Sequence, residues 1–181
     1  MFDGLVGRSL TTLAKILQSL IRYPHPNLVK FYGCVLKGDR IAGLVLEKYP
    51  TTLEQYFLQD QNDIGEFDAE AWMQGLRAGI QHLHSLRLAY NDLNPINVAL
   101  DGSDNVVKID LGSFRRFSED LISASTLRWF NEDSPGWAIS VKAYDDFGLM
   151  KLEQWLDGKR SESLARKREC GASGQESVAS R

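Results

Sequence analysis

The sequence has few cysteines, no long apolar run and no recognisable secretion signal. Its 181 residues contain two cysteines, Cys34 in an apolar stretch and Cys170 in a polar one. This usage argues against a disulfide framework and favours a reducing compartment. No apolar run is long enough to span a bilayer. The N-terminus lacks the basic start and uninterrupted apolar core of a signal peptide. We therefore expect a cytoplasmic or nuclear protein without a transmembrane segment.

The chain also lacks a strong excess of either charge. Its net charge is −3 at pH 7, so it has no basic surface of the kind that binds nucleic acid or an anionic membrane. We expect neither of these partners. What the chain does contain is 43% hydrophobic residues, which is enough to form the core of one globular domain or most of one.

Apolar residues recur at helical spacing in the first part of the chain. The spacing of Leu13, Ile16, Leu17 and Leu20 predicts an amphipathic helix over about residues 9–22. The prolines of YPHPN end this helix, because proline disfavours a helical residue before it. The segment LVKFYGCVLKGDRIAGLVLEKY then predicts two strands around the turn KGDR.

Helices and short strands alternate over the next part of the chain. TTLEQYFLQ predicts a short helix, and a longer one is expected from Phe67 to Leu86 with Asp68 as its N-cap. INVAL and VVKID predict two strands joined by the turn DGSDN. Residues 113–143 show little periodicity, and YDDFGLMKLEQWL then resumes a helix. The polar residues 157–181 have few large apolar side chains, so we expect this tail to be disordered.

The stretch YNDLNPINVALDGSDNVVKIDLG, residues 90–112, contains the candidate chemistry. Asp92, Asn97 and Asp110 are each common turn residues when taken singly. As a set, however, they lie at the ends of short strands that follow a long helix. A turn after Pro95 directs Asn97 back towards Asp92, and a hairpin returns Asp110 beside Asn97. We therefore expect the three side chains to converge.

Three converging oxygen-bearing side chains suit phosphoryl transfer. Mg²⁺ prefers a few hard oxygen ligands and completes its shell with water and substrate phosphates, which suits Asn97 and Asp110. Asp92, kept off the metal, can accept a proton from an attacking hydroxyl.

This stretch resembles the catalytic loop H-R-D-L-x-x-x-N and the D-F-G metal loop of eukaryotic protein kinases. Asp92 matches the catalytic base, Asn97 the metal-binding Asn, and Asp110 with Leu111 and Gly112 the D-F-G. The Asn before Asp92 is typical of divergent kinase-like proteins of filamentous fungi. The resemblance implies an α+β protein kinase-like fold with a mostly helical C-lobe and a partial N-lobe. It also implies ATP and Mg²⁺ as cofactors and a protein as substrate or partner.

The flanking segments resemble the same family over about residues 10–156. LAKILQSLIRYPHPNLVKFYG is similar to the αC helix and the strand after it, and GLVLEKYPTTLEQYF to the strand, hinge and first C-lobe helix. The resemblance implies an N-lobe remnant over 1–48 and a C-lobe over 49–156. It further implies a set of supporting positions. Leu46, Glu47, Tyr49 and Ala99 lie around the nucleotide, and Tyr90, Gly112 and Asp145 support the loops.

Several parts of the family pattern are missing. No Gly-rich loop or lysine strand precedes the first helix, where Arg8 and Lys15 are the nearest cations. The αC glutamate position falls near Leu13, and residues 4–38 contain no acid. The lysine–glutamate pair that positions the ATP phosphates therefore cannot form within this chain. By this comparison the chain is truncated at both ends, and we expect little or no phosphotransfer from it.

Three interpretations remain open at this point. The chain is a divergent protein kinase that acts on Ser/Thr hydroxyls, a pseudokinase that serves as a binding module, or a small-molecule phosphotransferase of the aminoglycoside or choline type. HPNLVKFYG favours the protein kinases over the third. His82 and His84 lie two apart on a helix and point in different directions, so we expect no metal pair there and a packing role for His84.

Overall fold

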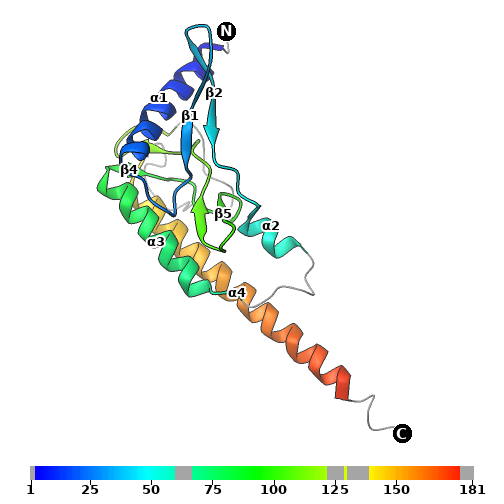
Figure 1. The fold of residues 1–181 in the computed structure, drawn as a ribbon. Coiled ribbons are helices and arrows are strands. Elements are labelled where there is room, and N and C mark those ends of the chain that lie inside the picture. The colour runs from blue at the N-terminus through cyan, green and yellow to red at the C-terminus, as the bar shows by residue number, and fades with distance from the viewer. Residues whose placement is uncertain (1–2, 60–66, 122–128, 130–138, 176–181) are drawn as a thin grey trace.

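The computed structural model describes residues 3–59, 67–121, 129 and 139–175 (Figure 1). Helices and short antiparallel strands alternate along this part of the chain. In order they are α1 (Asp3–Arg22), β1 (Phe31–Lys37), β2 (Arg40–Leu46), β3 (Thr51–Thr52), α2 (Leu53–Leu58), α3 (Ala69–Ser85), β4 (Leu88–Ala89), β5 (Val98–Leu100), β6 (Val106–Lys108), β7 (Arg115–Arg116) and α4 (Lys142–Gln175).

The first helix and the first hairpin pack together. β1 and β2 pair antiparallel, with Cys34 opposite Leu44, and α1 lies against both strands (Figure 1). Gly38 supplies the positive φ of 59° in the turn, which glycine adopts without steric cost. The buried residues of α1 include Ile16, Leu17 and Leu20, as their spacing predicts. The helix begins earlier than the expected residue 9.

The predicted hairpin near the candidate site is confirmed. β5 and β6 pair antiparallel, and β3 joins the other side of β5 to give the order β3-β5-β6. The Asp101 carboxylate accepts the N–H groups of Ser103 and Asn105 at 2.8 and 2.9 Å, which stabilises the connecting turn. β4 and β7 form a separate pair, with Leu88 opposite Arg116. The sequence did not indicate β3, β4 or β7, because two-residue strands carry no periodicity.

The core is centred on α3. Leu76, Ile80 and Leu83 are fully buried, and the helix packs against α4 and β6. The N-cap is Asp68, as predicted, since its carboxylate accepts the Ala71 N–H at 2.9 Å. An aromatic cluster covers one end of the core. It contains Phe57, Phe67, Trp72 and Trp155.

The linker between α1 and β1 is bonded to β6. Asn27 O accepts the Lys108 N–H at 3.0 Å, and the Val29 N–H donates to Lys108 O at 2.9 Å. The Lys108 side chain is itself 0% exposed, and its ammonium lies 3.3 Å from Asn27 O. Because burial disfavours the charged form, it lowers the pKa of Lys108 to about 7.

The C-terminal segment differs from the expectation of disorder. Residues 157–175 continue α4, which extends beyond α3 and away from the rest of the chain (Figure 1). Lysine, arginine, glutamate, leucine and alanine are good helix formers, and a helix already begun elongates at little cost. Lys159 also bonds Glu162 at 2.9 Å along the same face. Residues 176–181 lie outside the described part. No helix among the described residues combines the length and apolar character needed to cross a membrane.

Candidate functional site

Asp92 and Asn97 lie on one tight loop and are hydrogen-bonded to each other. The Asn97 amide donates to the Asp92 carboxylate at 2.9 Å and to Asp92 O at 3.0 Å. The loop folds back because Asn94 Oδ1 accepts the N–H groups of Ile96 and Asn97 at 3.0 and 3.2 Å. This is the Asx turn that an Asn before a proline favours. The turn after Pro95 therefore directs Asn97 towards Asp92, as the sequence predicts.

Asp110 lies beside this loop because the end of β6 and the Tyr90 side chain are both hydrogen-bonded to Asn97. The residue before Asp110, Ile109, donates its N–H to Asn97 O at 3.0 Å. The Tyr90 hydroxyl donates to the same oxygen at 2.9 Å. Burial raises the pKa of Tyr90 well above its usual value, and the nearby carboxylates of Asp110 and Asp92 raise it further. The structure thus brings the three predicted residues together, and their chemical roles remain predictions.

Two oxygens in this cluster accept no hydrogen bond from the described residues. Asp110 accepts the Gly112 N–H at 2.8 Å through Oδ1, and its Oδ2 has no such donor. Asn97 uses its amide nitrogen on Asp92, so its Oδ1 likewise has none. One carboxylate and one amide oxygen form a donor set that fits Mg²⁺ with water and phosphate as further ligands. Within the described ranges, no cluster of three or more His, Cys, Asp or Glu side chains offers a closed metal site.

Asp145 holds the start of the loop from the first turn of α4. It is 0% exposed, and its two carboxylate oxygens accept the N–H groups of Tyr90 at 2.9 Å and Asn91 at 2.7 Å. His84 Nε2 lies 2.7 Å from the oxygen that Tyr90 also uses. His84 therefore orients this carboxylate from α3, which extends the packing role that the sequence predicted for it.

Asn91 is a site residue whose structural role sequence reasoning missed. It is 3% exposed, with a φ of 66°. Its amide donates to Ala89 O at 3.1 Å and to Ser113 O at 2.9 Å, and its Oδ1 accepts the Ser140 hydroxyl at 3.1 Å. Asn91 thus connects Ser113 and Ser140 to the loop that carries Asp92 and Asn97. The available signal in the sequence was the residue type, because asparagine tolerates a positive φ better than most residues do.

The residues expected around the nucleotide are only partly available for binding. The Glu47 N–H donates to Lys30 O at 2.9 Å, so that group is already used. The Glu47 carboxylate accepts the Tyr32 hydroxyl, and the Tyr49 hydroxyl accepts the Lys30 N–H at 3.4 Å. No described residue bonds Glu47 O or the Tyr49 N–H. Leu46 is half-buried at the end of β2, and Ala99 is buried in β5.

The described side chains of α1 do not provide the lysine–glutamate pair that would position the ATP phosphates. Lys15 is exposed on the helix, and Leu13 is partly buried against the core. The ion pairs within the described part of the chain join Arg77 to Glu153, His84 to Asp145 and Lys159 to Glu162. None of them lies where a lysine–glutamate pair would position ATP.

Comparisons with known proteins agree on one family. The sequence profile described as "Protein kinase domain" matches residues 8–129, more than half of the chain. Serine/threonine-protein kinase/endoribonuclease IRE2 of Homo sapiens is 32% identical over 158 residues, covering 76% of this chain and 16% of that protein. IRE1 of Hypocrea jecorina (strain QM6a) is 26% identical over 133 residues, covering 68% of this chain and 11% of that protein.

Mitogen-activated protein kinase 4 of Homo sapiens is 30% identical over 169 residues, covering 84% of this chain and 27% of that protein. The chain therefore spans less than a third of each of these relatives. The matched region contains Asp92, Asn97 and Asp110. The helices and small antiparallel sheets of the structure agree with the expected α+β kinase-like fold. Family members in general use ATP and Mg²⁺. The chain belongs to the protein kinase family.

Proposed function

We propose that this chain carries the half of a phosphoryl-transfer site that contains the general base and the metal ligands, with protein Ser/Thr hydroxyls as acceptors. The observation that carries the proposal is the hydrogen-bonded pair of Asp92 and Asn97 beside Asp110, with Asn97 Oδ1 and Asp110 Oδ2 free of described donors. The relatives that the chain matches are named as protein kinases, which supports a protein hydroxyl as acceptor over an aminoglycoside or choline.

Asp92 acts in this proposal as the proton acceptor. The Asn97 amide fixes its Oδ2, and the hydrogen bonds from Tyr90 and Asn91 to Asp145 fix the loop on which it lies. A substrate hydroxyl that approaches Asp92 transfers its proton to the carboxylate as its oxygen attacks the γ-phosphorus of ATP; the bond from that phosphorus to the bridging oxygen breaks, and ADP leaves. The chain's contribution is positioning, which depends on the rigid loop.

Asn97 and Asp110 would hold the metal in this proposal. Bound Mg²⁺ neutralises charge on the phosphate oxygens of ATP. The backbone groups Glu47 O and Tyr49 N–H, which bond no described residue, bind the adenine edge in this proposal, with Leu46 and Ala99 as apolar neighbours. These nucleotide assignments rest on the family resemblance and on the free backbone groups.

The rate of transfer by this chain is expected to be low or nil. The lysine–glutamate pair among its described residues, Lys159 with Glu162, lies in the distal part of α4 and not beside the candidate site, and Asn94 stands where the family often has a lysine. Removing one preorganised charged or hydrogen-bonding group from such a site typically costs on the order of a hundredfold or more in rate. A binding module of the pseudokinase type is therefore the second candidate.

The test separates metal binding from proton transfer. We expect Mg²⁺ and ATP together to raise the melting temperature of the full chain, because ligands of the folded state stabilise it. Asp110→Asn should remove this shift, whereas Asp92→Asn should retain it. Any transfer of radiolabelled phosphate to a protein substrate should disappear in both variants. Asp146→Asn, an exposed neighbour of Asp145, serves as the matched control.

Two results would contradict these expectations. Absence of a Mg²⁺-dependent shift in the wild-type chain would sink the nucleotide site, and transfer that survives Asp92→Asn would remove Asp92 from its role. A shift without any transfer would favour the pseudokinase. Faster transfer to aminoglycosides or choline than to protein would favour the small-molecule alternative.

The remaining assignments follow from the same proposal. We assign residues 1–48 to an N-lobe remnant and residues 49–156 to a C-lobe, with a protein as substrate or partner. We also infer a cytoplasmic or nuclear location, because the described Cys34 is an exposed free thiol of the kind that persists in a reducing compartment.

A further inference from the structure

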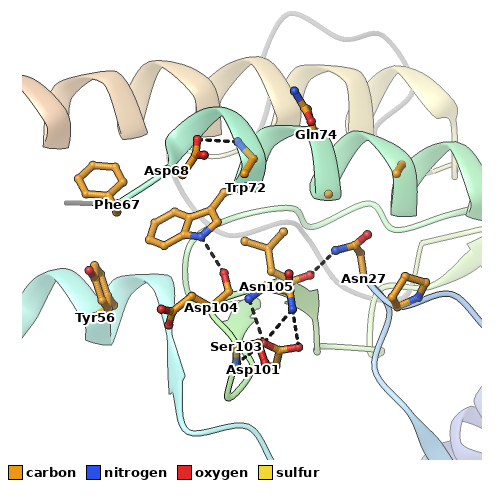
Figure 2. A pocket seen from close by; sticks show the side chains of 15 residues that line it. Asn27, Tyr56, Phe67, Asp68, Trp72, Gln74, Asp101, Ser103, Asp104 and Asn105 are labelled. Carbon is orange, nitrogen blue, oxygen red and sulfur yellow. Dashed lines mark hydrogen bonds between the residues drawn. The ribbon is translucent and has the colours of Figure 1, made fainter. Parts of the chain in front are cut away.

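The linker between α1 and β1 borders two cavities. One, of about 720 Å³, lies between α3 and the β5–β6 turn and is drawn in Figure 2. The other, of about 490 Å³, lies between the end of α1, the linker and the start of β1. We call the second cavity the α1 pocket, defined by Leu20, Ile21, residues 24–26, residues 28–31 and Tyr49.

The α1 pocket is separate from the residues proposed for phosphoryl transfer. Asp92, Asn97 and Asp110 do not line it, and of the residues assigned to the nucleotide only Tyr49 does. Its volume falls within the roughly 300 to 1,000 Å³ that is usual for ligand sites. The pocket is therefore large enough for a small ligand of its own.

The linker wall of the α1 pocket is held in place by hydrogen bonds to β6. The Asn27 amide donates to Val106 O at 2.8 Å (Figure 2), and Asn27 O accepts the Lys108 N–H at 3.0 Å. The Val29 N–H donates to Lys108 O at 2.9 Å. A wall that is fixed before binding loses little conformational freedom when a ligand enters. The pocket is thus formed in advance of any ligand.

Most of the lining of the α1 pocket is apolar. Leu20, Leu28 and Val29 are buried, Phe31 is half-buried, and Ile21 is 53% exposed. A ligand that covers these side chains removes apolar surface from water, which favours binding. The lining therefore selects a ligand with an apolar body.

The polar side chains of the lining carry hydrogen-bond donors without described acceptors. The exposed Lys30 ammonium bonds no described residue and lies over the Tyr32 ring at 5.1 Å, which is a weak contact. His25 Nδ1 accepts the Asn27 N–H at 3.2 Å, so the proton of the neutral ring is on Nε2. The Tyr49 hydroxyl accepts the Lys30 N–H at 3.4 Å, and its own proton has no described acceptor.

The lining carries a single positive charge at neutral pH. Burial, with His82 and Lys108 nearby, lowers the pKa of His25, so its ring is neutral. Burial raises the pKa of Tyr49, so its hydroxyl keeps the proton. No Asp or Glu is among the described residues that line the pocket. The one charge is that of Lys30, and it favours an anionic group on the ligand.

We propose that the α1 pocket binds a small apolar carboxylic acid. Its carboxylate pairs with the Lys30 ammonium, with His25 Nε2–H and the Tyr49 hydroxyl as further donors, and its hydrocarbon part lies along Leu20 and Ile21. One cation matches a single negative charge, whereas the triphosphate of a nucleotide carries several charges and would leave the apolar wall unused. The proposal does not depend on phosphoryl transfer.

The test uses the full chain and octanoate, whose affinity is measured by isothermal titration calorimetry. Octanamide is the matched comparison ligand, since it keeps the hydrocarbon chain and removes the charge. We expect the wild type to bind octanoate about tenfold more tightly than octanamide, because hydrogen bonds to a charged group are the stronger ones. Equal affinity for the two ligands, or no binding of octanoate, would overturn the proposal.

Substitutions at exposed positions test where octanoate binds on the protein. Lys30→Met should weaken octanoate binding about tenfold, because the charged partner is lost. Ile21→Ala should weaken it about threefold or more, because apolar contact is lost. Lys37→Met, at the exposed end of β1, should bind as the wild type does. Unchanged affinity in Lys30→Met would overturn the proposal, and an equal loss in Lys37→Met would overturn it in favour of a general effect of surface charge.

Discussion

Asp145 determines where the loop that carries Asp92 and Asn97 starts, although it lies more than fifty residues further along the chain. Its carboxylate is fully buried and accepts from Tyr90 N and Asn91 N, with His84 Nε2 at 2.7 Å. A carboxylate suits this position because it only accepts hydrogen bonds, and both backbone groups donate.

Replacing the Asp145 carboxylate tests whether it braces the start of this loop. In Asp145→Asn, the amide NH₂ must face one of the backbone donors, so at least one buried N–H loses its partner. We expect the free energy of unfolding to fall by about 2–4 kcal/mol. Urea denaturation followed by circular dichroism measures the change. Asp146→Asn, one position along and exposed, should stay within about 0.5 kcal/mol of wild type. Equal effects of the two changes would argue against the bracing role.

At the scale of elements, Gly148 shows how α4 constrains the loop that carries Asp92 and Leu93. It lies in α4, where an added Cβ would come within 2.8 Å of Leu93 Cβ and 3.2 Å of Leu93 O. Leu93 follows Asp92 directly, so the close approach of α4 determines where the predicted catalytic base lies. The same helix offers a matched position in Gly158, where an added Cβ meets nothing within 4 Å.

The two glycines should therefore respond in opposite directions to alanine. An exposed helical Gly→Ala change normally favours the helix by up to about 1 kcal/mol. Gly158→Ala should increase the helical circular dichroism signal without loss of stability. Gly148→Ala should lower the free energy of unfolding by about 1–3 kcal/mol, because Leu93 must shift. Thermal and urea denaturation of both variants measure this. A stabilised Gly148→Ala protein would contradict the close packing.

At the scale of the whole molecule, Lys108 makes the free energy of unfolding depend on pH. Its buried amine joins the linker at Asn27 to β6 and lies beneath Gly79 of α3, where an added Cβ would be 2.5 Å from Nζ. The Asp145 carboxylate favours the charged form, but burial outweighs it and lowers the pKa from 10.5 to about 7.

The stability of the protein should rise with pH because of this lysine. Between about pH 7 and 10.5 the unfolded chain binds a proton that the folded chain has released. The free energy of unfolding therefore increases with pH across this window, by at most about 1.4 kcal/mol per pH unit from this group. Below about pH 7 both states carry the proton, and the contribution stays at its least favourable value. Urea denaturation at several pH values measures the slope.

The variant Lys108→Met should flatten this slope, since it keeps an unbranched side chain and removes the titrating group. Lys37→Met, at an exposed position in β1, should leave the slope unchanged. If wild type and Lys108→Met show the same pH dependence between about pH 7 and 10.5, Lys108 is not the group responsible.

Local sequence was sufficient for much of the fold. Apolar periodicity predicted α1 and α3, Asp68 was recognised as a cap, and DGSDN predicted the β5–β6 hairpin, because each depends on neighbours a few residues apart. The same local logic predicted that Asn97 returns to Asp92 and that Asp110 lies beside them. The polar composition of residues 157–175 predicts disorder, whereas their helix propensity accounts for the helical course in the structure.

Contacts between distant segments decided the rest. The burial of Lys108 beside Asn27 and the hydrogen bonds from Asn91 to Ser113 and Ser140 join residues far apart in the chain. Local sequence patterns do not predict these contacts, because each contact depends on which distant elements pack together. The residue types of the candidate site could thus be predicted from the sequence, whereas the contacts that support the site depend on how distant elements pack.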